Sequence, residues 1–297
     1  AVLIYENNPG SVFDQERLVK KTTVIRGDVR NLGLVEKILK QYRIDTIFHL
    51  AAQAIVDQAV DDPLETFEVN MQGTWNVLEA ATHAKSVKRI IVASSDKAYG
   101  HHDKLPYREH TTPLKGVYPY EVSKACADLI SQSYHKTFGL PVAITRATNL
   151  YGPGDLKFNR IVPRTIASLH YNRSPVVRDT HESLRDYLYV EDAADAYIKL
   201  AEHMRPALHG HAFNFSTNKP RSVGGVIQAI SKELGKHLPP RVIKTAGFEI
   251  KHQYASYAKA AKLIGWKPKT SFREGIRKTI PWYVEHLKRN SKPKEVL

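Results

Sequence analysis

The first half of the chain alternates short apolar runs with longer amphipathic stretches. Apolar runs of strand length occupy residues 1–5, 22–26, 45–50, 88–93 and 141–145. Between them, apolar residues recur at helical spacing over 31–43, 63–84 and 118–138. Strands that alternate with helices form βα units, and the strands of such units pair in parallel. The pattern therefore predicts an α/β fold with a doubly wound parallel sheet.

The rhythm changes after about residue 150. Turn signals become denser there, and short helices mix irregularly with short strands. We predict a first domain over residues 1–150, built on the parallel sheet, and a smaller mixed α/β lobe that makes up most of 151–297. The strand–helix alternation of the first domain is typical of dinucleotide binding, which leaves the second lobe for the substrate.

Composition narrows the class of partner. The chain is 42% hydrophobic and 25% charged, as globular proteins are, and no apolar run approaches the roughly 18 residues of a membrane-spanning helix. The net charge is +14, but the basic residues are scattered and no nucleic-acid-binding motif accompanies them. We therefore expect a phosphate-bearing small molecule, and neither nucleic acid nor membrane. A single cysteine, Cys126, excludes an intrachain disulfide, and a cytoplasmic location is the simplest.

The first candidate catalytic pair is Tyr120 and Lys124. On a helix, residues four apart share a face. A lysine ammonium beside a phenol favours the phenolate and so lowers the pKa of the tyrosine. Such a pair can remove a proton from a sugar hydroxyl. The spacing alone is equally typical of an ordinary pair on a helix surface.

A polar segment, Ser94 to Gly100, follows the apolar run 88–93. In an open parallel sheet, ligands bind beyond the carboxyl ends of the strands. The Ser95 hydroxyl, the Asp96 carboxyl and the Lys97 amine therefore stand where a ligand would bind. A polar turn is the alternative, and the tyrosine–lysine pair that follows favours a site.

The histidine pairs His101-His102 and His209-x-His211 invite a metal interpretation. Neither pair has a carboxylate or a cysteine at a helical ligand spacing. We therefore expect no metal site.

Several segments together resemble the extended short-chain dehydrogenase/reductase superfamily of NAD-dependent epimerases and dehydratases. They are His49-Leu50-Ala51-Ala52-Gln53, Asn70-x-x-Gly73-Thr74, the serine-rich strand end, Tyr120-x-x-x-Lys124 and Arg185-Asp186-Tyr187-Leu188-Tyr189-Val190. The resemblance runs from residue 1 to about 285. It implies a Rossmann-like sheet, NAD as cofactor, a nucleotide-diphosphate sugar as substrate, and a homodimer formed through the helices near 63–84 and 118–138.

Within the superfamily, Ser95-Asp96-Lys97 is similar to the CDP-glucose 4,6-dehydratases. The segment from Tyr151 to Pro163 resembles the same branch, whereas the segment 185–192 resembles the dTDP-sugar branch. The resemblance therefore favours CDP-glucose and leaves the nucleotide base open.

A 4,6-dehydratase oxidises C4 of the hexose, eliminates water across C5 and C6, and returns the hydride to C6. The resemblance implies that Tyr120 takes the proton of the 4-hydroxyl while Ser95 hydrogen-bonds that oxygen. It also implies that Asp96 protonates the departing 6-hydroxyl and that Lys97 removes the C5 proton. A lysine acts as a base only when its pKa is lowered, and Lys124 could supply the positive charge that does so. A diphosphate contact is the alternative role for Lys97.

The resemblance further implies which residues bind the two ligands. It places NAD against Glu6, Asp28, Val29, Leu50, Ala51, Ala52, Gln53, Asn70 and Ser94, together with Tyr120 and Lys124. It places the substrate against Asn149, Asn159, Arg160 and Arg185. The planar fork of arginine suits phosphate oxygens.

The family's opening glycine-rich turn is not found in this sequence. Residue 1 resembles the start of the second strand, so a unit of roughly 30 residues, the first strand and helix, is missing relative to the family. That strand is central in the usual order. We therefore expect no bridge between the strands at 1–5 and 22–26 and the strand at 45–50, and weak or no binding of NAD by the sequence as printed.

Two alternatives stay open. The first is a nucleotide-sugar epimerase or reductase of the same superfamily, against which Asp96 and Lys97 argue, because epimerisation needs no acid at C6. The second is a non-catalytic protein that binds nucleotide sugars, which only the missing glycine segment supports.

Overall fold

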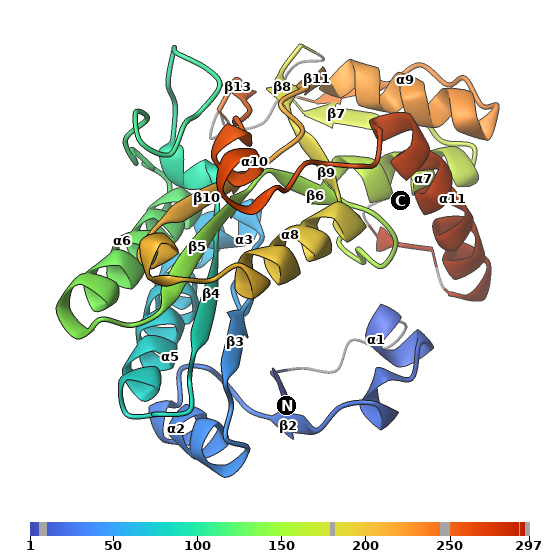
Figure 1. The fold of residues 1–297 in the computed structure, drawn as a ribbon. Helices are drawn as coiled ribbons and strands as arrows, with labels where there is room; N and C mark the ends of the chain where they lie inside the picture. Colours follow the sequence, from blue (N-terminus) through green and yellow to red (C-terminus); the bar gives the residue numbers. More distant parts are fainter. Residues whose placement is uncertain (6–10, 179–181, 244–249, 291, 295–297) are drawn as a thin grey trace.

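The computed structural model describes residues 1–5, 11–178, 182–243, 250–290 and 292–294 (Figure 1). Its largest sheet has four parallel strands in the order β10-β5-β4-β3. The strands are β3 (Thr46–His49), β4 (Arg89–Ser95), β5 (Val142–Ala147) and β10 (Ala212–Phe215). The parallel α/β fold predicted from the sequence is therefore confirmed. The strand β10 comes from the second part of the chain, which the sequence pattern had given mainly to the substrate lobe.

Helices cover both faces of this sheet because its strands are apolar on both sides. Ile90 and Val92 of β4 pack on one face, and Ile91 between them packs on the other. Successive side chains of a strand point to opposite faces, so a continuous apolar run needs a layer on each side. The helices of the first layer include α2 (Leu32–Gln41), α5 (Gly73–Thr82) and α6 (Pro119–Phe138), and those of the second are α8 (Val190–Glu202) and α10 (Ala258–Ile264).

The helical stretch predicted over 63–84 is present as three consecutive segments. They are α4 (Pro63–Phe67), the π-helical turn η2 (Glu68–Gln72) and α5, and the short helix α3 (Val56–Asp61) precedes them. Asp62 accepts a hydrogen bond from the backbone N–H of Glu65 and Pro63 occupies the first turn, so the start of the helix lies where the sequence placed it.

The two N-terminal strands pair with each other and not with the main sheet. β1 (Val2–Ile4) and β2 (Val24–Arg26) form a parallel pair of their own, as expected from the sequence. With α1 (Val12–Gln15) and the turn η1 (Leu18–Lys20), they lie apart from β3 in Figure 1. Beyond β2, Gly27 and the loop that follows lead to α2.

The second lobe is built on helices with short strand pairs beside them. Its helices are α7 (Ile161–His170), α9 (Val223–Leu234) and α11 (Phe272–Arg289), with the short turn η4 (Pro206–Leu208) before β10. Its strand sets are β6 (Asn149–Tyr151) with β9 (Tyr187–Tyr189), β7 (Val176–Arg178) with β12 (Arg241–Ile243), and β8 (Leu184–Arg185) between β11 (Arg221–Ser222) and β13 (His252–Gln253).

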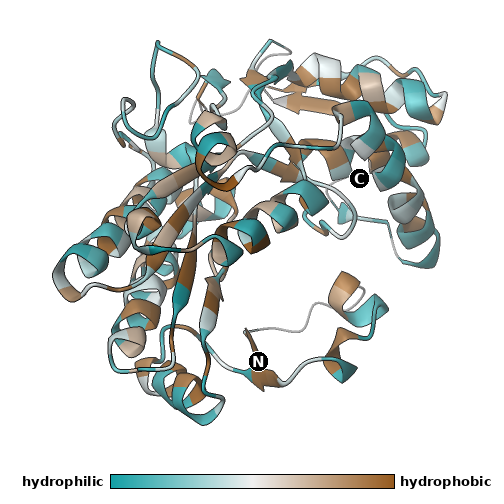
Figure 2. Ribbon diagram, in the orientation of Figure 1, coloured by the Kyte–Doolittle hydropathy of each residue, from teal (hydrophilic) through white to brown (hydrophobic). Residues whose placement is uncertain are grey.

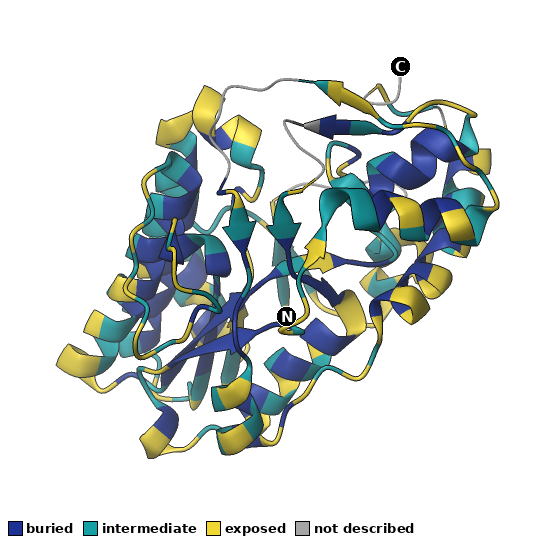
Figure 3. Ribbon diagram, turned by 90° about the horizontal axis from the view of Figure 1, so that it is seen from above, coloured by how far each residue is buried: buried dark blue, intermediate teal, exposed yellow. Residues whose placement is uncertain are grey.

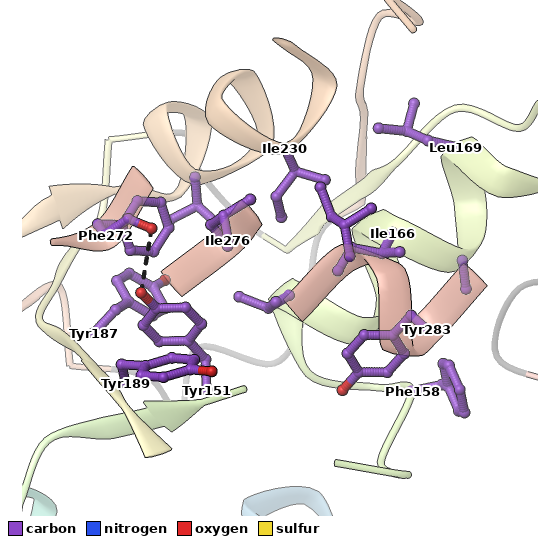
Figure 4. Packing of buried hydrophobic residues seen from close by; sticks show 14 of the residues in the cluster. Tyr151, Phe158, Ile166, Leu169, Tyr187, Tyr189, Ile230, Phe272, Ile276 and Tyr283 are labelled. Atoms are coloured by element: carbon purple, nitrogen blue, oxygen red, sulfur yellow. Dashed lines mark hydrogen bonds between the residues drawn. The ribbon is translucent and has the colours of Figure 1, made fainter. Parts of the chain in front are cut away.

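Aromatic rings dominate the core of this lobe. Tyr151, Tyr187, Tyr189 and Phe272 pack together, and the Tyr151 hydroxyl donates a hydrogen bond to the Phe272 carbonyl at 3.2 Å (Figure 4). Figures 2 and 3 show where apolar and buried residues lie in the part of the chain that the structure describes. The strands of the main sheet are largely apolar and buried, and polar, exposed residues lie on the outer faces of the helices. No helix of the described residues is both long and apolar enough to cross a bilayer.

Candidate active site

The carboxyl end of β4 continues directly into a 3₁₀ turn, η3 (Asp96–Tyr99). Ser95 is the N-cap of this turn: its hydroxyl accepts a hydrogen bond from the Lys97 backbone N–H at 3.2 Å and donates one to Asp96 Oδ1 at 3.2 Å. The polar segment therefore stands at the edge of the sheet where parallel strands bind ligands, as the sequence predicted.

Tyr120 reaches the same place from the first turn of α6. Pro119 starts the helix, and a hydrogen bond joins the Tyr120 and Ser95 side chains. Burial raises the pKa of Tyr120 to about 12, and the hydrogen bond with Ser95 offsets this only in part. The phenol is thus protonated in the protein alone, and an added positive charge is needed to make it a base.

Lys124 lies one turn further along α6, buried beneath the strand. Its ammonium donates a hydrogen bond to the Ala93 carbonyl at 2.9 Å, and burial lowers its pKa to about 8. The sequence had predicted that Lys124 holds the pKa of Tyr120 down. In the structure that pKa is raised, because the desolvation of the phenol outweighs the favourable interactions around it.

Asp96 is the most strongly perturbed carboxyl of the site. Its side chain is 2% exposed, and burial raises its pKa to about 7, although the charge of Lys97 opposes this shift. Oδ1 has the Ser95 hydroxyl as a partner, whereas Oδ2 is buried with no hydrogen-bond partner in the structure. A carboxylic acid that keeps its proton close to neutral pH is suited to act as a general acid.

The second lobe brings Arg185 and Asp186 to this site. The charges of both residues act on Asp96, Arg185 lowering its pKa and Asp186 raising it. Arg185 is 6% exposed, and its Nη1 donates hydrogen bonds to the Leu184 and Lys251 carbonyls at 3.0 and 3.1 Å. Arg185, which the sequence predicted to bind the substrate, is thus buried and close enough for its charge to act on the acid.

Asp186 was not assigned a role from the sequence. Its carboxylate accepts the backbone N–H groups of Thr217 and Asn218 at 3.0 and 2.9 Å, and also the Thr217 hydroxyl. Its backbone carbonyl accepts both the backbone N–H and the side-chain amide of Asn149 at 3.1 Å. Asp186 therefore holds the start of β6, and with it Asn149, against the loop after β10.

Asn159 and Arg160 lie on the loop before α7. Arg160 is exposed and forms an ion pair with Asp155 at 3.0 Å, and its positive charge favours the ionised form of Tyr120. The charge of Arg160 thus acts on the tyrosine from the part of the chain where the sequence placed the substrate.

The loop after β3 is locked by Asn70. Its side chain accepts the Gln53 backbone N–H at 2.8 Å and donates to the Gln53 carbonyl and to the Ser123 hydroxyl at 3.0 and 2.9 Å. The Ser123 hydroxyl in turn donates to the Tyr120 carbonyl at 2.8 Å. Asn70 thereby ties the predicted cofactor loop to the helix that carries the tyrosine.

The residues that precede Gln53 leave an apolar surface uncovered. Leu50 is 58% exposed, Ala51 is exposed and Ala52 is part-buried, all at the carboxyl end of β3. A flat ring system can cover such small apolar side chains, and Lys124 and Tyr120 stand on the neighbouring helix. This uncovered surface fits a flat ring of NAD, which the sequence predicted to bind these residues.

Three other residues predicted to bind NAD, Asp28, Val29 and Ser94, make contacts within the protein. Arg30 grips the Asp28 carboxylate through Nε and Nη2 at 2.9 and 2.7 Å, and Val29 packs so tightly against Gly73 that an added Cβ there would lie 2.6 Å from it. The Ser94 hydroxyl donates to the Lys124 carbonyl at 3.0 Å, so it positions α6. Glu6 lies outside the described residues.

Sequence reasoning missed two groups near the site. Gln253 is fully buried and neither its Nε2 nor its Oε1 has a partner, and it lies opposite Arg185 in the β13–β8 pair. Arg146 and Asp128 form a buried ion pair behind η3. An arginine inside the apolar run of β5 was a signal for the second group, whereas nothing in the sequence marks Gln253.

The described residues contain no group of three or more His, Cys, Asp and Glu side chains that could hold a metal ion. His101 faces Asp103 at 3.4 Å, and His102 contacts the Tyr99 and Pro113 carbonyls.

Comparisons with known proteins agree with this geometry. Residues 6–279 match the family model of GDP-mannose 4,6 dehydratase. The chain is 31% identical over 277 residues to dTDP-D-glucose 4,6-dehydratase of Bos taurus, covering 89% of this chain and 74% of that enzyme. It is 30% identical over 266 residues to a trifunctional UDP-glucose 4,6-dehydratase, epimerase and reductase of Arabidopsis thaliana, covering 88% of this chain but only 39% of that protein.

A solved structure supports the same relationship. That of DesIV, a dTDP-glucose 4,6-dehydratase from Streptomyces venezuelae with NAD and TYD bound, aligns with a TM-score of 0.83 at 26% identity and covers 90% of this chain and 81% of its own.

Fold and site together define a member of the NAD-dependent epimerase/dehydratase superfamily, as predicted from the sequence. Within it, the chain belongs to the GDP-mannose 4,6-dehydratase family. The relatives named above include 4,6-dehydratases, which are hydro-lyases, so the predicted enzyme class is confirmed at the level of the family. Their names specify dTDP-glucose and UDP-glucose, so the preference for CDP-glucose is not confirmed.

Proposed function

We propose that this protein is an NAD-dependent 4,6-dehydratase that converts a nucleotide-diphosphate hexose to the 4-keto-6-deoxy sugar. The observation that carries the proposal is Asp96, a buried carboxyl with a pKa raised to about 7, beside Ser95 and within reach of the charge of Arg185. An acid of this kind is required to expel the 6-hydroxyl as water, whereas epimerisation at C4 makes no use of it.

The residues of the chain divide the proton transfers among them. Tyr120 takes the proton of the 4-hydroxyl and Ser95 hydrogen-bonds the same oxygen. Asp96 gives its proton to the departing 6-hydroxyl, and Lys97, next to it on the 3₁₀ turn, removes the proton from C5. Arg160, Arg185 and Asn149 hold the diphosphate and sugar from the second lobe.

NAD would lie on Leu50, Ala51 and Ala52, with Lys124 and Tyr120 at its nicotinamide end. Bound NAD would supply the acceptor and donor for the hydride that leaves C4 and returns to C6, and its positive charge would favour the phenolate of Tyr120. Asn70 accepts a hydrogen bond from the Gln53 backbone and donates one to Ser123 of α6. These bonds hold this surface in a fixed position against α6.

The proposal also concerns which nucleotide base the substrate carries. Ser95-Asp96-Lys97 favours CDP-glucose, and the relatives named above act on dTDP-glucose and UDP-glucose by their names. We take CDP-glucose as the first substrate to test and the other two as the next.

The test incubates the protein and NAD⁺ with CDP-, dTDP-, UDP- and GDP-hexoses and measures product masses. Loss of one water from one member supports the proposal and names the base. Unchanged masses throughout, in a preparation that binds NAD by calorimetry, would exclude the dehydratase and leave an epimerase or a binding protein.

A change of Tyr120 to phenylalanine tests the first proton transfer. We expect kcat to fall by about 10²–10⁴-fold, because the group that receives the 4-hydroxyl proton is lost. Substrate dehydration is followed by mass spectrometry, and Tyr118→Phe, at the N-cap of the same helix, is the control. A Tyr120→Phe enzyme with the turnover of the control would assign the base to another residue.

We further propose that the protein forms a homodimer through the helices near 63–84 and 118–138. Large apolar side chains are exposed there: Leu64 is 67%, Trp75 40% and Leu129 55% exposed. These side chains lie on helices that pack against one another, and an exposed apolar patch formed by such helices is typical of an interface. Light scattering after size-exclusion chromatography distinguishes the expected twofold mass from that of the 33.6 kDa monomer.

A further inference from the structure

A buried ion pair stands directly behind the 3₁₀ turn that carries Asp96. Arg146 of β5 binds Asp128 of α6 through two parallel contacts, Nε to Oδ2 at 2.7 Å and Nη2 to Oδ1 at 3.0 Å. The two side chains are 5% and 0% exposed. Such a bidentate pair is rigid because the planar guanidinium fits both carboxylate oxygens at once.

The third arm of the guanidinium extends to the turn itself. Arg146 Nη1 donates to the Tyr99 hydroxyl at 2.8 Å, and that hydroxyl donates to Asn214 Oδ1 on β10 at 2.8 Å. The Asn214 backbone N–H is in turn bound by Glu109 at 2.8 Å. Tyr99 has no exposed surface, so its hydroxyl is fixed at both its donor and its acceptor side.

The backbone directly after Tyr99 is also held by close contacts. The Tyr107 ring lies 4.7 Å from the Tyr99 ring, and its hydroxyl donates to the Gly100 carbonyl at 2.6 Å. Gly100 has φ +68°, and a Cβ there would lie 2.2 Å from the Lys115 carbonyl oxygen. These contacts therefore restrict the backbone that follows η3 to one conformation.

Asp96 and Tyr99 are the first and last residues of η3. In a 3₁₀ helix, residues three apart lie on the same side, so Asp96 and Tyr99 share one short backbone turn. A displacement of this backbone at Tyr99 would be passed on to Asp96. This relation joins the buried ion pair to the acid, although the two do not touch.

We propose that Arg146 and Tyr99 are positioning residues that hold the Asp96 carboxyl in its buried place beside Ser95, an inference that rests on the dehydratase function proposed above. Without the Tyr99 hydroxyl the turn loses its anchor on β5 and β10, and Asp96 can turn toward water. The carboxyl then ionises at lower pH and no longer delivers its proton to the leaving hydroxyl.

The groups that face Asp96 define what else could move its ionisation. They are Ser95 and Lys97 on its own segment, Arg185 and Asp186 from the second lobe, Tyr120 from α6 and Tyr107 from the loop after η3. A Tyr99→Phe change alters none of these side chains. A shift in the basic limb of the activity profile is therefore attributed to Asp96 when the stability measurement described below shows the same shift.

The decisive variant is Tyr99→Phe, with Tyr151→Phe as the matched control. Tyr151 is also buried and donates one hydrogen bond, to the Phe272 carbonyl, in the core of the second lobe. We expect Tyr99→Phe to lower kcat by about tenfold or more with an unchanged KM, and to move the basic limb of the pH profile toward lower pH. The control should lose thermal stability alone.

A second measurement needs no turnover. The difference in unfolding free energy between the wild type and Asp96→Asn, followed against pH, reports the ionisation of Asp96 in the folded protein. We expect the pH at which this difference levels off to be lower in the Tyr99→Phe background. If Tyr99→Phe does not fold, Arg146→Lys keeps the charge beside Asp128 and shortens the reach to Tyr99, and the same two readouts apply.

A Tyr99→Phe enzyme whose pH profile and stability difference match those of the wild type would overturn the inference. Failure of the proposed function looks different: the wild type then dehydrates no sugar of the panel, while the stability measurement still tests the position of Asp96.

Discussion

The Asp96→Asn enzyme is expected to lose dehydration by about 10²–10⁴-fold and to be more stable than the wild type above pH 7. The amide of asparagine cannot give a proton to the departing 6-hydroxyl. It also cannot ionise, and it keeps the size and the Ser95 contact of the original side chain. The Asp96→Asn substitution therefore tests two effects at once. The rate of dehydration reports the carboxyl as a proton donor, and the unfolding free energy reports the destabilisation that its ionisation causes.

The stability effect follows from the direction of the pKa shift. Burial raises the pKa of Asp96 from 3.8 to about 7 in the folded protein. A carboxyl with a raised folded pKa favours folding while protonated, and that contribution is lost as the pH rises from the unfolded to the folded pKa. The loss approaches about 4 kcal/mol above pH 7, and Asp96→Asn escapes it.

Two measurements check this prediction. Product masses give the loss of dehydration, and urea unfolding between pH 4 and 8 gives the stability of both proteins. The difference between them should grow over that range and level off above pH 7. Asp103→Asn, an almost fully exposed carboxyl on the next loop, is the control and should change neither quantity. Full dehydration by Asp96→Asn would instead favour an epimerase or reductase, or a different acid.

Removing the partner of the buried arginine should have the largest effect on stability. We expect Asp128→Asn to destabilise the protein by about 3–5 kcal/mol, because it leaves the Arg146 charge buried without its carboxylate. Burial costs the guanidinium its hydration, and the remaining contacts, to the Tyr99 hydroxyl and to a neutral amide, return only part of it.

The matched comparison is an exposed ion pair of the same chemistry. Arg289 and Glu285 lie 2.7 Å apart on α11, but their side chains are 73% and 53% exposed. Glu285→Gln should change the unfolding free energy by less than about 1 kcal/mol. Chemical denaturation with guanidinium chloride measures both variants. A cost for Asp128→Asn as small as that for Glu285→Gln would mean that water reaches Arg146, and the anchoring of Tyr99 would then lose its basis.

The local sequence was sufficient to predict the elements that carry the candidate catalytic residues. The helix over 118–138 and the strand over 88–93 follow from the spacing of apolar residues, and both are present as α6 and β4. Because parallel strands end at one edge of a sheet, the convergence of Ser95, Asp96 and Tyr120 could also be foreseen. These are properties of periodicity and chain order, which act over a few residues.

Other parts of the site depend on residues far apart in the chain. β10 joins the main sheet from residues 212–215, and its Asn214 completes the contact to Tyr99 across 115 positions. No local pattern shows which strand will pair with β5, because a short apolar run suits many neighbours.

The protonation states of the site residues also depend on residues far apart in the chain. The sequence determined that a tyrosine, a lysine and an aspartic acid meet at the end of a strand, in a family of NAD-dependent nucleotide-sugar dehydratases. Only the tertiary structure decided their protonation, since burial, and not chain spacing, raises the pKa of Asp96 and Tyr120 and lowers that of Lys124. Desolvation depends on everything that packs around a group, and those neighbours come from every part of the chain.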